Sequence, residues 1–144
     1  MNPLHVFAEL NFRSNNVKGN QFHNNSDCGI STGHKDTDVN FENNHIFENG
    51  TSGVFFREEN PSNSPHRNTF INNTVENNGT AKGGYGFVFN GNALELVLDN
   101  NVIRDTKNGS QKAAIFIAKN APPITEKNNK MSGHSLGNVV NGKQ

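Results

Sequence analysis

Cysteine is almost absent from this chain of 144 residues, and because Cys28 is its only cysteine, the monomer cannot hold an internal disulfide. An excess of charge of either sign is also missing, since 13 basic residues balance 13 acidic ones. This balance removes the electrostatic reason to expect a nucleic acid or an anionic membrane as a partner. Residues 1–10 lack a basic segment followed by a long apolar run, so the sequence predicts neither a signal peptide nor a membrane-spanning helix.

Motifs for several common chemistries are missing as well. The six histidines show no spacing typical of a zinc site, and the chain contains no Gly-x-Ser-x-Gly elbow, phosphate loop or dinucleotide fingerprint. We therefore expect no metal and no cofactor. Hydrophobic residues make up only 31% of the chain, which is low for an ordinary globule but enough for the narrow core of a solenoid.

Asparagine, in contrast, is abundant, with 28 residues that recur in register. The clearest repeat, 40–57, contains an apolar residue, two asparagines, a second apolar residue, an Asn-Gly turn and an alternating apolar triplet. The pattern returns every 24 to 29 residues approximately, which indicates a repeat architecture. Leucines are too few for a leucine-rich repeat, whereas short apolar segments between Asn/Gly turns predict three short strands per coil.

Two columns of asparagine support a parallel solenoid. Equivalent residues of successive coils lie about 4.8 Å apart, so their amides can bond to one another along the axis. Asparagine also tolerates the left-handed backbone that sharp corners need. We therefore assign a structural role to Asn20, Asn44, Asn73, Asn101 and Asn129 in the first column, and to Asn25, Asn49 and Asn78 in the second.

The order Asn-x-Ile-x-x-Asn-Gly, followed shortly by Gly-Val-x-Phe, resembles the right-handed parallel β-helix repeat of pectate-lyase-like proteins over residues 17–131. The resemblance implies an all-β fold, a right-handed parallel β-helix of about four to five coils. We expect one domain, 1–144, with an incomplete first coil (1–12), regular coils (13–122) and an irregular last coil or tail (123–144). Pectate-lyase-like proteins include lyases, hydrolases, epimerases, phage tailspikes and non-enzymatic surface proteins, so the activity stays open. The resemblance implies an extracellular or periplasmic location.

Side chains alternate along the last strand of each coil, which places one set inside and the other on the outer surface. The outward set is mostly apolar where water is expected, and such stripes mark contact with another surface. We expect packing against protein first and stacking against sugar second. Calcium prefers oxygen ligands, so the calcium site of pectate lyases is not carried over to any residue here. The stripe consists of Phe7, Ser31, Phe55, Val88 and Phe116.

Charged residues of both signs gather at the corner that follows these strands. A uronate-processing site needs a base that takes a proton and cations that neutralise the carboxylate. An alternative is ion pairing between coils, His34 with Glu58 and Lys35 with Glu59. Prolines in segment 58–67 exclude ladder bonds and predict a protruding loop beside this corner. The candidate catalytic residues are His34, Lys35, Arg57, Glu58, Glu59 and His66, with Lys119 and Arg67 as further binding cations.

Two functions are compatible with these patterns. The first is a carbohydrate-associated module that binds an acidic polysaccharide or processes it as a lyase or epimerase does. The second is a non-catalytic assembly module that oligomerises through Phe55, Val88 and Phe116 or through open solenoid ends. Segment 5–8 fits the last strand of a coil whose earlier part is missing, and unpaired strand edges seek partners. A homodimer is therefore the expected state.

Overall fold

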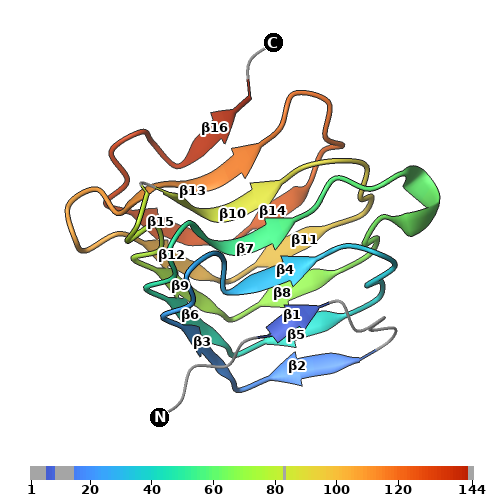
Figure 1. Ribbon diagram of the computed structural model, residues 1–144, viewed down its shortest axis with the longest axis horizontal. Helices are drawn as coiled ribbons and strands as arrows, with labels where there is room; N and C mark the ends of the chain where they lie inside the picture. The colour runs from blue at the N-terminus through green and yellow to red at the C-terminus, as the bar shows by residue number, and fades with distance from the viewer. Residues whose placement is uncertain (1–5, 9–14, 83, 143–144) are drawn as a thin grey trace.

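The chain forms a parallel β-solenoid in which short strands stack from coil to coil (Figure 1). The computed structural model describes residues 6–8, 15–82 and 84–142. Within these residues every strand pair is parallel, and the one helical element is a turn of 3-10 helix, η1 (Pro61–Asn63). No helix in this part of the chain is long and apolar enough to cross a membrane. The predicted all-β solenoid is therefore confirmed.

Each of the three sheets collects one strand from each of the five coils that begin at β2, and β1 is an additional strand of the six-stranded sheet. The six-stranded sheet contains β1 (Val6–Ala8), β4 (Ile30–Thr32), β7 (Ser52–Phe56), β10 (Gly84–Phe89), β13 (Gln111–Ile117) and β16 (Val139–Asn141). The first five-stranded sheet contains β2 (Asn16–Lys18), β5 (Asn40–Glu42), β8 (Thr69–Ile71), β11 (Val97–Asp99) and β14 (Thr125–Lys127). The second contains β3 (Gln21–His23), β6 (His45–Phe47), β9 (Thr74–Glu76), β12 (Val102–Arg104) and β15 (Lys130–Ser132).

Strand pairing follows the register that the repeats predict. Phe41 lies beside Phe70 in the next coil, and Phe70 lies beside Leu98 in the coil after it. At the N-terminal side Val6 pairs with Ile30, so β1 occupies the place of a last strand, as the repeat predicts for segment 5–8. The sequence period therefore corresponds to one complete coil.

Inward side chains fill a narrow core of phenylalanine and aliphatic residues. Phe41 and Phe70 stack across adjacent coils with ring centroids 4.3 Å apart, and Phe87 meets Phe70 edge-on at 5.2 Å. Burial of a phenylalanine side chain contributes about 1.5–3 kcal/mol. A few rings per coil thus stabilise a chain that is poor in hydrophobic residues.

The first asparagine column forms a continuous line of hydrogen bonds parallel to the axis. The side-chain oxygen of Asn73 accepts from the backbone N–H of Asn44 at 2.9 Å and from its side-chain amide at 3.1 Å. Asn73 in turn donates to the oxygen of Asn101 at 3.1 Å and to the Phe41 carbonyl at 3.0 Å. Asn20 and Asn129 continue the column on either side. Since the central amides are buried, these bonds satisfy groups that water cannot reach.

The second column, Asn25, Asn49 and Asn78, bonds in the same way and ends on a residue that the repeat does not predict. Gln111 takes the fourth place and accepts from the side-chain amide of Asn78 at 2.9 Å. A glycine beside the column leaves space for it, because a Cβ at Gly53 would lie 3.0 Å from the amide nitrogen of Asn78. The Asn-Gly-x-x-Gly pattern of the repeat therefore serves the column directly.

Residues 123–142 include a fifth coil, formed by β14, β15 and β16. This coil buries little, since Leu136 is 55% exposed and Val139 is 46% exposed. His134 connects it to the second amide column, because Gln111 Nε2 donates to His134 Nε2 at 3.1 Å. That contact requires an unprotonated ring nitrogen. Burial lowers the pKa of His134, and the nearby Asp105 carboxylate opposes this effect only in part.

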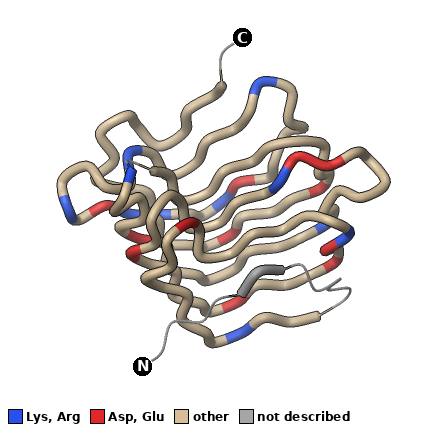
Figure 2. The backbone as a smooth tube through the Cα atoms, viewed as in Figure 1, with Lys and Arg blue, Asp and Glu red and all other residues tan. Residues whose placement is uncertain are grey.

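Charges of both signs are interspersed along the coils, without a large region of one sign (Figure 2). Several of them form ion pairs between neighbouring coils, such as Lys18 with Glu42 at 3.4 Å. Exposed pairs of this kind contribute about 0–1 kcal/mol each. The amide columns and the core, rather than surface charge, therefore determine the fold.

The amide columns predict a clear contrast between two classes of asparagine. Asn73→Ala should lower the free energy of unfolding by about 1–3 kcal/mol, because it leaves the Phe41 carbonyl and the Asn44 amide without their buried partner. Asn63→Ala, in the loop, is the control and should change it by less than about 0.5 kcal/mol. Urea unfolding measures both values. Equal losses would contradict the structural role of the column.

The contact of His134 predicts a pH dependence. The unfolded chain binds a proton at the ordinary histidine pKa of about 6.5, whereas folded His134 binds it less readily, so stability should decline as pH falls below about 6.5. His134→Asn keeps an acceptor for Gln111 but does not titrate. Melting temperatures of the two proteins should diverge below that pH, with the parent losing more. Parallel curves would contradict the assignment.

Candidate functional site

The outer face of the six-stranded sheet carries a groove of about 640 Å³. Its base comes from the strands β4, β7, β10 and β13, and its sides come from the turns that precede and follow them. We call this site the groove. The groove is lined by Asp27, Cys28, Ser31, Thr51, Ser52, Phe55, Arg57, Lys82, Gly84, Tyr85, Val88, Asn90 and Phe116.

The base of the groove is the predicted apolar stripe. Phe55, Val88 and Phe116 are register partners in β7, β10 and β13, so they form one row across the sheet. The stripe is less exposed than the sequence predicts: Val88 is 7% exposed and Ser31 is 8% exposed, while the two phenylalanines are half-buried. The side walls shield this row, so it is a recessed surface rather than an open stripe. Phe7 lies outside the residues whose side chains are described.

Tyr85 belongs to the groove, although the sequence pattern did not identify it. Its ring stacks on Phe116 with centroids 5.1 Å apart and an interplanar angle of 29°. Strict alternation places Tyr85 on the same side as the buried Phe87, yet Tyr85 lines the groove, as does its register partner Ser52 in β7. The four residues inserted before Tyr85 in this repeat, 81–84, were the available sequence signal that β10 departs from the regular pattern.

Polar residues stand on both sides of the apolar base. Arg57 follows β7, where its Nη1 donates to Ser31 Oγ at 3.0 Å and its Nε lies 3.5 Å from Glu59 Oε2. Across the groove, Thr51 Oγ1 donates to Asp27 Oδ1 at 2.6 Å. These contacts fix a guanidinium on one side and a carboxylate on the other.

Cys28 also lines the groove. Burial, and next the negative charge of Asp27, raise the pKa of the Cys28 thiol to about 11. At neutral pH the side chain is therefore a protonated thiol, which is a poor nucleophile. The groove is better suited to binding than to thiol chemistry.

A family model described as a right-handed β-helix region matches residues 5–103 of the chain. The chain belongs to this right-handed β-helix family. The match agrees with the resemblance to pectate-lyase-like proteins. No curated protein and no solved structure matches the chain.

Of the corner candidates of this β-helix, Arg57 lines the groove, whereas the others do not line it and do not form one cluster. His34 and Lys35 are exposed and have left-handed backbones, with φ of 49° and 71°. Neither of the alternative ion pairs, His34 with Glu58 or Lys35 with Glu59, occurs among the described residues, and Glu59 instead faces Arg57. The pairs fail because the two turns differ in conformation. Glu58 and Lys119 line a separate small pocket of about 220 Å³.

His66 and Arg67 hold the predicted protruding loop in place. His66 Nε2 donates to the Pro61 carbonyl at 2.7 Å, and its Nδ1 accepts from the Leu94 backbone N–H at 3.0 Å. Arg67 pairs with Asp38 at 2.7 Å. Since both ring nitrogens of His66 have backbone partners, this side chain has no free atom for proton transfer.

The described part of this β-helix contains no group of three or more His, Cys, Asp or Glu side chains placed to hold a metal ion. The acidic side chain in the lining of the groove is Asp27, which already accepts from Thr51. Of the residues predicted for a site, the groove brings together Phe55, Arg57, Val88 and Phe116.

The raised pKa of Cys28 predicts slow alkylation. A rise from 9.0 to about 11 lowers the thiolate fraction at neutral pH about a hundredfold, and the stronger nucleophilicity of the more basic thiolate recovers about tenfold. Iodoacetamide should therefore modify the folded β-helix about ten times more slowly than the urea-denatured chain, as followed by mass spectrometry. Equal rates would contradict the burial of Cys28 and the raised pKa of its thiol.

Proposed function

We propose that this β-helix is a carbohydrate-binding module and that an acidic polysaccharide lies in the groove. The observation that carries the proposal is the recessed row of apolar side chains with polar residues on both sides. Ligand sites combine an apolar surface with a few fixed polar groups in this way. A sugar ring matches it, because its C–H face is apolar and its edges carry hydroxyls.

Aromatic side chains supply the surface for stacking. Phe55, Tyr85 and Phe116 contribute three rings, and the stack between Tyr85 and Phe116 fixes the orientation of two of them. Aromatic rings offer a large apolar area at low conformational cost. A chain of sugars that crosses β7, β10 and β13 would meet one residue of the apolar row at each coil.

Arg57 supplies the preference for a carboxylate. Its contacts with Ser31 and Glu59 use one N–H of Nη1 and the Nε, and they leave Nη2 and the second N–H of Nη1 for a ligand. Lys82 places a second cation in the lining, whereas the carboxylate of Asp27 accepts from Thr51. Arginine recognises planar carboxylates through paired hydrogen bonds, so uronates are the favoured class of sugar.

Assembly through the same face is the competing proposal. A stable protein interface buries about 1,200–2,000 Å² in total. Val88 is 7% exposed and the phenylalanines of the stripe are half-buried, so the apolar row offers little area to a second globular surface. A slender ligand fits a recessed row better than a flat partner does.

Tyr85 provides a direct test, because it is the only tyrosine and the chain has no tryptophan. Titration with oligogalacturonate or oligomannuronate should change the intrinsic fluorescence with a saturable curve. Phe116→Ala should weaken binding about tenfold or more, which corresponds to about 1.4 kcal/mol. Arg57→Gln should weaken binding of uronates more than binding of neutral oligosaccharides. The control, Arg67→Gln, removes an arginine engaged by Asp38 and should leave affinity unchanged.

Three results would separate the alternatives. Absence of binding to every uronate oligomer would overturn the proposal. Release of unsaturated product, lost in a Glu58→Gln and His34→Ala double variant, would place catalysis at the corner instead of binding alone. A dimer in light scattering that Phe55→Lys with Phe116→Lys dissociates would favour assembly through the stripe.

A further inference from the structure

The sheet formed by β3, β6, β9, β12 and β15 carries a second site on its own outer face. A shallow hollow of about 380 Å³ lies over β6, β9 and β12. None of its lining residues lines the groove. We call this second site the hollow, and its lining includes Asn43, His45, Asn72, Thr74, Glu76 and Arg104.

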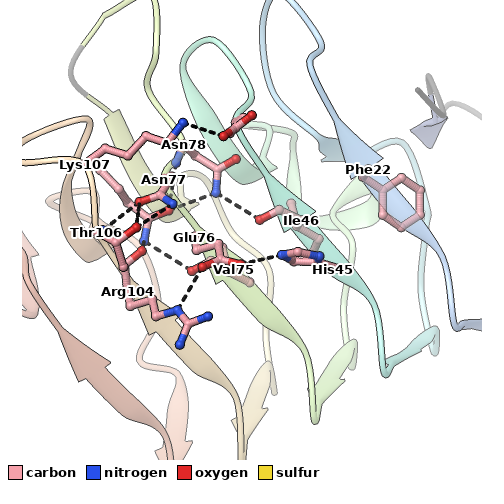
Figure 3. Close-up of polar contacts among 12 residues, drawn as sticks. Phe22, His45, Ile46, Val75, Glu76, Asn77, Asn78, Arg104, Thr106 and Lys107 are labelled. Atoms are coloured by element: carbon pink, nitrogen blue, oxygen red, sulfur yellow. Dashed lines mark hydrogen bonds and ion pairs between the residues drawn. The ribbon is translucent and has the colours of Figure 1, made fainter. Parts of the chain in front are cut away.

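Glu76 is the centre of the hollow. Its Oε2 lies 2.5 Å from His45 Nε2, and its Oε1 accepts from Arg104 Nε at 2.8 Å. Figure 3 shows the carboxylate between these two side chains, which come from the strands on either side. Each oxygen keeps a lone pair for a further donor, and Arg104 keeps its terminal nitrogens for an acceptor.

Ring stacking makes this arrangement rigid. His45 stacks on Phe47 with centroids 4.0 Å apart, and Phe47 stacks on His23 of the preceding coil at 4.6 Å with an interplanar angle of 8°. Rigid side chains lose little conformational entropy when a ligand binds. The cluster is thus pre-organised, unlike a typical exposed ion pair.

Amide and hydroxyl groups border the cluster. Asn43 and Asn72 are exposed, and their left-handed backbones have φ of 55° and 58°. Asn72 Oδ1 accepts from Asn100 at 2.5 Å, which fixes the amide and leaves its Nδ2 as a donor. Thr74 adds a hydroxyl that donates and accepts. The hollow therefore presents donors and acceptors side by side.

The paired charges of Glu76 and Arg104 favour an uncharged ligand over a charged one. Burial acts to raise the pKa of Glu76, but hydrogen bonds from Arg104 and His45, with their charges, outweigh burial and hold the pKa below its usual value. Glu76 is consequently ionised at neutral pH and its charge cancels that of Arg104. A carboxylate or phosphate would meet Glu76, and an ammonium group would meet Arg104.

We propose that the hollow binds a neutral, hydroxyl-rich ligand, namely an uncharged sugar unit at the end of or within an oligosaccharide. Vicinal hydroxyls donate to Glu76 and accept from Arg104 and Asn72, which is the pairing that this set of groups offers. The proposal goes beyond the function assigned to the groove, because the residues, the face of the β-helix and the charge of the ligand all differ.

NMR on the isotope-labelled full chain tests the proposal. The probes are maltohexaose, cellohexaose, xylohexaose and mannohexaose, with oligogalacturonate for comparison. At least one neutral probe should shift the side-chain amide signals of Asn43 and Asn72 and the ring signals of His45 in a saturable manner. No shift with any neutral probe, or larger shifts with oligogalacturonate, would overturn it.

Two variants test whether the hollow itself binds. Asn72→Gly removes the amide but retains a residue that accepts a left-handed backbone, and it should weaken binding of the active probe at least tenfold. Thr74→Val should weaken it as well. Asn128→Gly is the matched control, since Asn128 has φ of 58° at the same corner but does not line the hollow. Unchanged affinity in Asn72→Gly, or an equal loss in Asn128→Gly, would overturn the proposal.

Phe116→Ala distinguishes this proposal from the function of the groove. The variant should leave the shifts at His45 and Asn72 unchanged, because Phe116 lines the groove and does not line the hollow. Loss of those shifts in Phe116→Ala would mean that the probe binds in the groove and would overturn a separate site. If uronates do not change the fluorescence of Tyr85, the proposal for the groove fails, but the NMR test of the hollow still applies.

Discussion

Hydrogen bonds between buried side-chain amides, repeated once per coil, are the interaction on which the rest of the β-helix depends. The columns of Asn44 and Asn49 run along the two strand ends of the sheet formed by β3, β6, β9, β12 and β15, so each coil is aligned at two points. A slip of one residue would leave buried donors and acceptors unsatisfied in every coil, at about 1–3 kcal/mol for each group. Register is therefore fixed more firmly than strands of three residues alone would achieve.

This constraint explains how much of the fold the sequence reveals. Asn-Gly turns and apolar triplets act locally and recur with the coil, so strand positions, register and both columns are predictable from residues such as Asn73 and Ile46. Gln111 escaped the prediction because the turn at 105–110 lengthens its coil and a longer side chain is needed to reach Asn78. Periodicity shows which residues repeat, but not which residue substitutes for a missing one.

Surface sites are harder to predict because they depend on departures from the repeat. Tyr85 lines the groove although alternation places it inside, and Nδ1 of His66 accepts from the backbone N–H of Leu94, which is distant in sequence. Glu76 and His45 lie in adjacent coils, yet only the structure shows that one carboxylate joins His45 to Arg104. The apolar stripe was predicted correctly as a row. How little of that row is exposed depends on turns whose shape the sequence does not specify.

The amide columns also give the β-helix a direction. In both of them the bonds between amides all run one way, because each side-chain oxygen accepts from the preceding coil and one amide N–H donates to the next coil, as in Asn44 to Asn73 and Asn49 to Asn78. The second amide N–H donates back to a strand carbonyl of the preceding coil. Aligned bonds polarise one another along the line, so the two columns add into a dipole parallel to the axis. A further coil extends these columns only head to tail. A two-fold symmetric contact through the ends would set donors against donors or acceptors against acceptors, whereas a polar stack of coils continues the same pattern of bonds.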